Sequence, residues 1–435
     1  MQPTGGVRVR IVLAVNGSRG DAQPAVALGT ELVGRGHDVT LALPPDLVDF
    51  GRGAGLVTEP YGGKTRELLD SDLVRSDLKS ANPRRRLRAI SEISVRGGRE
   101  MQHQLLDLTE GADAVVATSA GQERAHNVAH VRAIPHIPLH YCPIRPNRST
   151  SLLAQFGIDG PGVLNLWSWR LVEHTLWVAT RRAENTLRTE LGLPAATAPY
   201  ARQIAATGVP EIQAYDPVLF DGLAAEWNTR APLVGFFDLA ATQRSGVGDA
   251  GLDDDLRNWL DAGDPPVYVG FGSMMPSDPT GLAAAFREAA AERGLRLLVS
   301  GGWSGFMSDD QAVDDNIRLV GHIDHDTILP LCRAAVHHGG AGSLAAGLRA
   351  GLPTLVTWFG ADQPIWGRAV AKSGLGATLP VARVTGPRLT AAFDAVLSPT
   401  VAAKTEALPH TMIRPDVAVA TAADLVTRVI DDSRE

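Results

Sequence analysis

The chain has 435 residues, of which 44% are hydrophobic and 20% charged, and its formal net charge is −7. This length exceeds one ordinary hydrophobic core, so two domains of roughly 200 residues each are expected. The acidic balance argues against a general nucleic-acid-binding protein, which would be basic. Cys142 and Cys332 stand far apart, which disfavours a disulfide framework or a zinc site and favours a reducing cytoplasm.

The apolar runs along the chain are short. The first one ends at Val15, which is too early for a secretory signal, and no window approaches the roughly 18 apolar residues of a membrane span. We therefore expect a soluble cytoplasmic protein without stable membrane insertion.

The first half of the chain alternates between predicted strands and helices. A near-continuous apolar strand over 9–15, a polar turn over 16–21, a helix over 22–33 and a strand over 38–43 make a βαβ unit. Further strands are expected over 114–118 and 134–141. The stretch 151–189 has a helical pattern.

The second half restarts the same alternation after a stretch rich in Gly, Asp and Ser. We interpret 241–264 as a linker, followed by strands over 267–271, 295–300, 317–320, 334–337 and 353–357, with helices over 281–293 and 343–350. The fold class is therefore α/β, with two doubly wound domains facing a cleft, an N-terminal one over 1–240 and a C-terminal one over 265–416. A final helix within 417–435 can cross back to the N-terminal domain.

The run from His337 to Ser343 carries the most chemical information. It joins a short apolar strand to a helix, and its glycines leave backbone N–H groups bare at a helix N-terminus, where the partial positive charge favours phosphate. Asp362 and Gln363 follow nineteen residues after Ser343 and supply a carboxylate and an amide suited to sugar hydroxyls. We interpret these features as a nucleotide-sugar site. The alternative is a glycine-rich turn that only permits tight packing.

This region also resembles a known family. The run HHGGAGSLAAGLRAGLPTLVTWFGADQPIW is similar to the donor-site signature of inverting GT-B glycosyltransferases, in the actinobacterial natural-product and sterol-type group of the UDP-glycosyltransferase superfamily. The usual HHGGAGT becomes HHGGAGS here. The resemblance implies that Asp362 and Gln363 contact the donor sugar, and that the donor diphosphate is held by His338 and by the amides of Gly340, Ala341, Gly342 and Ser343.

Three further segments resemble the donor side of the same family. In YVGFGSM, over 268–274, the resemblance implies that Ser273 reaches the donor phosphates. The segment 320–323 matches the place where the base and ribose are held, which implicates His322 and Ile323, although its HIDHD form departs from the commoner pattern. Trp303 is a candidate for the nucleotide pocket wall, with core packing as the alternative.

The turn GSRGD, over 17–21, resembles a motif of the same group, and we expect Ser18, Arg19 and Gly20 on the donor side of the site. An inverting transfer requires the acceptor hydroxyl to lose its proton, and the resemblance implies Asp21 as the base. The alternative is that Asp21 is a helix N-cap, which would lower its pKa and weaken it as a base. One residue could serve both roles.

Residues of about 60 to 200 are expected to bind the acceptor. Trp167 and Trp169, together with Trp177, are candidates for an apolar wall, with core packing as the alternative. His140, with His136, is a reserve candidate for contact with the acceptor or for the base, although each is readily explained as structural. Arginines cluster at 84, 85, 86, 88, 96 and 99. We interpret them first as a solvated helix face; the alternative is contact with anionic lipid headgroups at a membrane or with an acidic acceptor.

The predicted function is inverting, metal-independent transfer of a hexose from a UDP- or TDP-sugar to a hydroxyl of a bulky apolar acceptor. No cofactor beyond this co-substrate is expected, because helix N-termini can offset the charge of the leaving group. A natural-product acceptor is favoured, with a glycolipid or a sterol as alternatives. A sugar-nucleotide epimerase and a non-catalytic transferase-like partner protein are the competing functions. An oxidoreductase is disfavoured because 17–21 lacks the G-x-G-x-x-G fingerprint.

Overall fold

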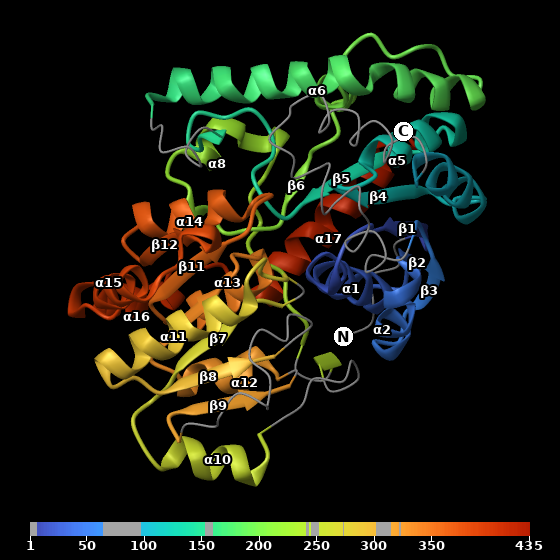
Figure 1. Ribbon diagram of the computed structural model, residues 1–435. Helices are drawn as coiled ribbons and strands as arrows, with labels where there is room; N and C mark the ends of the chain where they lie inside the picture. The colour runs from blue at the N-terminus through green and yellow to red at the C-terminus, as the bar shows by residue number, and fades with distance from the viewer. Residues whose placement is uncertain are drawn as a thin grey trace.

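The computed structural model describes residues 7–63, 97–152, 160–240, 243–244, 252–272, 274–301, 315–321 and 323–435. They form two α/β domains that lie side by side, each built on a six-stranded sheet (Figure 1). The predicted fold class is confirmed. Among the described helices, none is both long enough and apolar enough to cross a membrane.

The N-terminal sheet is parallel and has the order β3-β2-β1-β4-β5-β6. Every residue of β4 is buried, as expected for a strand covered on both faces. The strands are β1 (Arg10–Ala14), β2 (Asp38–Leu43), β3 (Val57–Pro60), β4 (Ala114–Thr118), β5 (His136–His140) and β6 (Ile212–Gln213). The helices include α1 (Arg19–Gly34), α2 (Val48–Gly53), α5 (Gln122–Arg132), α6 (Gly162–Glu190), α7 (Tyr200–Thr207) and α8 (Leu223–Trp227).

The C-terminal sheet repeats this plan with the order β12-β11-β10-β7-β8-β9. Its strands are β7 (Val267–Gly270), β8 (Leu297–Ser300), β9 (Ile317–Val320), β10 (Ala334–His337), β11 (Thr354–Trp358) and β12 (Gly376–Pro380). Its helices include α10 (Asp254–Asp261), α11 (Pro279–Arg293), α12 (His325–Ile328), α13 (Ala341–Arg349), α14 (Gln363–Lys372), α15 (Gly386–Val396) and α16 (Pro399–Ala407).

Strand order fixes where a ligand can bind in each domain. In both sheets all strands run parallel, and the order in which they are added reverses between the first and fourth strands, β1 and β4 in one domain and β7 and β10 in the other. Doubly wound sheets bind ligands beyond the carboxyl ends of the strands at this switch point. The turn before α1 and the turn before α13 both begin there.

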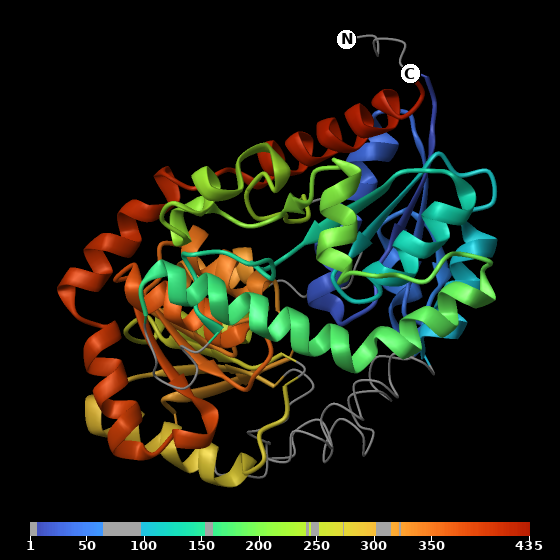
Figure 2. The same ribbon diagram turned by 90° about the horizontal axis from the view of Figure 1, so that it is seen from above.

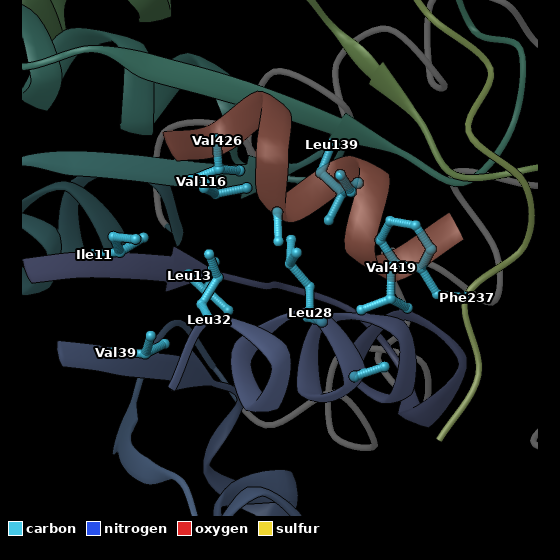
Figure 3. Packing of buried hydrophobic residues seen from close by; sticks show 14 of the residues in the cluster. Ile11, Leu13, Leu28, Leu32, Val39, Val116, Leu139, Phe237, Val419 and Val426 are labelled. Atoms are coloured by element: carbon cyan, nitrogen blue, oxygen red, sulfur yellow. The ribbon is translucent and has the colours of Figure 1, made fainter. Parts of the chain in front are cut away.

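The last helix, α17 (Pro415–Asp432), packs on the N-terminal domain (Figures 2 and 3). Its apolar face, including Val419 and Val426, shares one core with Leu13 and Leu28. Arg35 anchors the outer side through an ion pair of 2.6 Å to Asp424. The helix that the sequence predicts within 417–435 therefore crosses back to the first domain.

Removing part of this core should loosen the crossing helix. Val426 is fully buried, so Val426→Ala should lower the free energy of unfolding of the N-terminal domain by about 2 kcal/mol. Val417→Ala, on the same helix at 45% exposure, should leave it nearly unchanged. Urea denaturation of both variants checks this, and equal losses would contradict the packing.

The domain boundary differs from the predicted one in two respects. Tyr215, Phe220 and Phe236, expected in the N-terminal domain, pack against Trp366 and Leu344 of the C-terminal domain and form an interdomain core. The range expected as a linker up to 264 contains α10, whose buried leucines 256 and 260 pack with Tyr268 and Leu298. A short amphipathic helix supplies too little periodicity to be assigned to a domain from sequence.

Candidate active site

The turn after β1 holds Asp21 in a capping box. Ser18 is the N-cap of α1, and the Asp21 carboxylate accepts the Ser18 N–H at 2.8 Å and the Ser18 hydroxyl at 3.2 Å. A Cβ at Gly17 would collide with this carboxylate, so glycine is required there. Helix α1 thus begins at Arg19, earlier than predicted, and Asp21 is its third residue and not its N-cap.

Burial decides the protonation behaviour of Asp21. Its pKa is raised to about 6, mainly by desolvation and to a smaller extent by the nearby Asp362 carboxylate, against the lowering effect of the hydrogen bonds from Ser18. The predicted lowering by a cap position is outweighed. A carboxylate that titrates near neutral pH is better matched to accepting a proton than an exposed aspartate.

The turn after β10 presents bare amides at the start of α13. Gly340 is the N-cap, and the first helical hydrogen bond is donated by Leu344 to Gly340. The N–H groups of Ala341, Gly342 and Ser343 precede it and have no acceptor within the helix. Gly342 is exposed, and a Cβ there would meet no atom within 4 Å. The start of this helix therefore has amides unpaired within the helix and an uncrowded Gly342, the features of an anion-binding helix N-terminus.

The two histidines of this turn, His337 and His338, have different roles. His337 is buried, and its Nδ1 accepts the Gly339 N–H at 3.0 Å, which holds the turn closed. His338 lies between the two glycine turns, because a Cβ at Gly272 would be 3.3 Å from its Cε1 and a Cβ at Gly340 would collide with its Nε2. Burial lowers the pKa of His338 to about 4, so the imidazole is neutral near pH 7.

Asp362 and Gln363 begin α14 and are oriented by their own surroundings. The Asp362 Oδ2 accepts a hydrogen bond of 2.9 Å from the Trp366 indole N–H. The Gln363 Oε1 accepts the backbone N–H groups of Phe359 and Gly360 at 2.8 and 3.3 Å, so its amide nitrogen is the group left to meet a sugar hydroxyl. Burial raises the pKa of Asp362.

The indole of Trp366 should set the position of the Asp362 carboxylate. Trp366→Phe removes the hydrogen bond and keeps most of the buried ring, so the KM for the sugar donor should rise about threefold to tenfold. Trp227→Phe is the matched control, because Trp227 belongs to the same interdomain core and its indole bonds to Pro146. An equal change in KM in both variants would show that only packing matters.

The turns from the two domains face each other. Besides burial, the Asp362 carboxylate raises the pKa of Asp21. Burial raises the pKa of the Cys142 thiol, which follows β5, and the Asp362 and Asp21 carboxylates add to this rise. Asp238 connects the helices behind these turns: it accepts a hydrogen bond of 3.1 Å from Gln23 of α1 and pairs with Arg349 of α13. Asp21 and Asp362 therefore lie near each other between the domains. The start of α13 lies beside Asp362 and Gln363, because a Cβ at Gly339, next to the N-cap of this helix, would be 3.3 Å from the Gln363 side chain.

The comparisons with known proteins agree with this architecture. Residues 11–102 match the glycosyltransferase family 28 N-terminal domain, and residues 304–427 match the erythromycin biosynthesis protein CIII-like C-terminal domain. An uncharacterized glycosyltransferase of Mycobacterium tuberculosis is 37% identical over 96% of this chain and 98% of its own length. A sterol 3-beta-glucosyltransferase of Arabidopsis thaliana is 30% identical over 93% of this chain and 63% of that protein. The structure of glycosyltransferase VinC with dTDP matches with a TM-score of 0.65 at 20% identity, covering 97% of this chain and all of that one.

The chain belongs to the glycosyltransferases. The predicted family and the predicted class of enzyme are confirmed. Within the described ranges of this glycosyltransferase, no three His, Cys, Asp or Glu side chains are grouped so as to hold a metal ion.

The structure shows the surroundings of the other residues that the sequence predicts for the donor side. The Arg19 guanidinium stands 5.0 Å above the Phe50 ring of α2. Ile323 is 9% exposed and packs in the same core cluster as Tyr268. Gly20 is exposed in the first turn of α1. Predictions for Ser273, Trp303 and His322, and for the arginines from 84 to 96, concern positions outside the described residues.

The expected acceptor residues do not form one wall. Trp167 is 61% exposed on α6, whereas Trp169 is 7% exposed and donates its indole N–H to Thr150 at 2.9 Å. His140 is fully buried and bonds to Glu211 at 2.9 Å, so its imidazole is out of reach of an acceptor. Helical periodicity places residues two apart on different faces, which is why the two tryptophans separate.

The sequence analysis did not predict the polar network that surrounds His140. His140 contacts the Ser119 hydroxyl at 3.1 Å, and Arg145 pairs with Glu211 at 2.6 Å. Ser119 follows β4 directly and is the half-buried end of this network, next to the switch point. The signal available from sequence was a serine immediately after a short buried strand, Ala114–Thr118, at the same sheet edge as Asp21.

Proposed function

We propose that this glycosyltransferase moves a hexose, with inversion, from a UDP- or TDP-sugar to a hydroxyl of a bulky apolar acceptor. The observation that supports this most is the pairing of a carboxylate titrating near pH 6, Asp21, with a helix N-terminus that can receive a diphosphate, the two held face to face between the domains. A base and an anion site on opposite sides of one space are what a direct displacement requires.

These groups account for each bond and proton of the transfer step. The acceptor oxygen attacks the anomeric carbon while its proton passes to the Asp21 carboxylate. The bond between the anomeric carbon and the phosphate oxygen breaks, and the nucleoside diphosphate leaves with the electron pair. The amides of Ala341, Gly342 and Ser343, with His338, stabilise the charge that develops on the diphosphate, while Asp362 and the Gln363 amide contact the sugar hydroxyls.

The charge stabilisation comes from backbone amides in this proposal, so no metal or other cofactor is required. Transferase activity should therefore persist in excess chelator, measured as nucleoside diphosphate release. Loss of activity in chelator, restored by a divalent cation, would contradict this part of the proposal.

The acceptor class rests on the relatives. The match of residues 304–427 to an erythromycin biosynthesis protein domain supports a natural-product scaffold, and the dTDP in the VinC structure supports a TDP-sugar as one possible donor. The likeness to a sterol 3-beta-glucosyltransferase favours a sterol or glycolipid hydroxyl as the second candidate. All these acceptors present a hydroxyl on a large apolar body.

Mass-spectrometric screening of acceptor panels with UDP-glucose and TDP-sugars tests the proposal. The expected result is an acceptor mass increased by one hexose, with the anomeric configuration opposite to that of the donor by proton NMR. Isomerisation of the UDP-sugar without acceptor would instead indicate an epimerase. Absence of any transfer across the panels, with intact nucleotide binding, would indicate a non-catalytic partner protein.

A further inference from the structure

Helix α6 turns an apolar face toward solvent. Seven of its large apolar side chains are between 39% and 72% exposed. Two of them, Val172 and Leu176, lie on another side of the helix, and five share one side: Val163, Leu164, Trp167, Leu171 and Val178. With a rise of 1.5 Å per residue, this stripe is about 22 Å long. Surface helices of globular proteins normally turn such a stripe inward, and large exposed apolar patches mark interaction sites.

The inward side of α6 is correspondingly polar in its first turns. Asn165 and Ser168 are buried, and the Asn165 amide donates to the Arg148 carbonyl at 2.9 Å. Trp169 is the large apolar side chain that anchors this part of the helix. The polarity of this part of α6 is therefore inverted relative to a helix that only covers a core.

Positive charge accompanies the outward stripe. Arg170, Arg181 and Arg182 are exposed on α6, although the chain as a whole carries a net charge of −7. Trp177, Arg181 and Arg182 also line a hollow of about 950 Å³ beside the second half of the helix. Figure 2 shows α6 lying across the front of both domains, so a flat surface can approach it along its length.

We propose that the outward face of α6 binds the surface of a bilayer that contains anionic lipids. The apolar stripe enters the boundary between headgroups and acyl chains, and the arginines pair with the headgroups. A long, flat, apolar face flanked by cationic groups fits this partner better than it fits another copy of an acidic chain. The inference does not depend on the proposed function.

Vesicle flotation of the full-length protein tests this directly. The probes are vesicles of phosphatidylcholine alone and vesicles containing equal parts of phosphatidylglycerol. We expect binding to the anionic vesicles that weakens as salt is raised. The double variant Leu171→Ser/Val178→Ser should reduce partitioning at least about 10-fold, and Arg181→Gln and Arg182→Gln about fivefold each.

The matched control is Val33→Ser/Val131→Ser. These valines are 43% and 41% exposed on α1 and α5, away from the stripe, so the control should bind vesicles like the wild type. All the substituted side chains are exposed, so we expect every variant to keep its fold. Circular dichroism melting of every variant checks this.

Four results would overturn the proposal. The first is that folded wild-type protein floats with neither kind of vesicle at low salt, and the second is that it floats equally with both. The α6 double variant could bind as well as its control. Light scattering could instead reveal a dimer that Leu171→Ser/Val178→Ser dissociates, which would make this face a contact between two copies.

Discussion

Asp21→Asn should reduce turnover on the order of 100-fold or more while leaving UDP affinity near that of the wild type. The amide cannot take the proton of the acceptor hydroxyl. Its oxygen can still accept the Ser18 N–H, which the Asp21 carboxylate now accepts at 2.8 Å, so the capping box and the fold are kept. Steady-state transfer assays and calorimetric titration with UDP give the two values.

The control for this substitution is Asp49→Asn, on the exposed side of α2 in the same domain. It should leave both turnover and UDP affinity unchanged. Near-normal turnover in Asp21→Asn would restrict Asp21 to its capping role and remove it as the base.

The raised pKa of Asp21 also predicts the shape of the pH profile. Since the base must be ionised, kcat/KM should fall below pH about 6 and level off above it.

The same raised pKa predicts that Asp21 makes the folded protein less stable as pH rises, although it makes the enzyme more active. The folded pKa exceeds the unfolded one, so Asp21 costs stability as pH rises from about 4 through about 6. The Tm of Asp21→Asn relative to the wild type should therefore be higher at pH 8 than at pH 4, which differential scanning calorimetry measures.

His338→Ala should weaken binding of UDP or dTDP by about 10- to 150-fold, because a hydrogen bond to a charged phosphate contributes about 1.5–3 kcal/mol. The imidazole is neutral before the nucleotide binds, so the charge in this contact comes from the ligand. The effect should appear in the affinity for nucleoside diphosphate and be much smaller for a nucleoside without phosphates.

Calorimetric titration of both ligands measures this loss. His410→Ala, at an exposed position distant in sequence, is the control and should bind normally. His337→Ala should act differently, by loosening the turn that its Nδ1 holds closed. Unchanged diphosphate affinity in His338→Ala would contradict the assignment of His338 to the donor.

Local patterns predicted most of the strands, but not β3, β6 and β12, which lie at sheet edges. The apolar runs that became β1, β4 and β10 could be read directly, because strands buried on both faces carry little polar sequence. The starts of α1 and α13 were placed two or three residues late. For α1, Ser18 and Asp21 have the spacing of a capping box, a signal that was present and was interpreted as a turn.

Other features of the site depend on contacts between residues that are far apart in the sequence, and the sequence alone did not predict them. Which of the two adjacent histidines faces the site depends on the approach of Gly272 and Gly340 to His338. The raised pKa of Asp21 depends on burial and on Asp362, more than 300 residues away in the chain. Periodicity likewise predicts an apolar stripe on α6 but not that the stripe turns outward.

A crystal structure of the protein with bound UDP or dTDP tests the central claim most directly. The account predicts the diphosphate at the N-terminus of α13, within hydrogen-bond distance of His338 and of the amides of Gly342 and Ser343, with the Asp21 carboxylate facing it from the other domain. A nucleotide bound at another place, or a diphosphate turned away from Asp21, would contradict it.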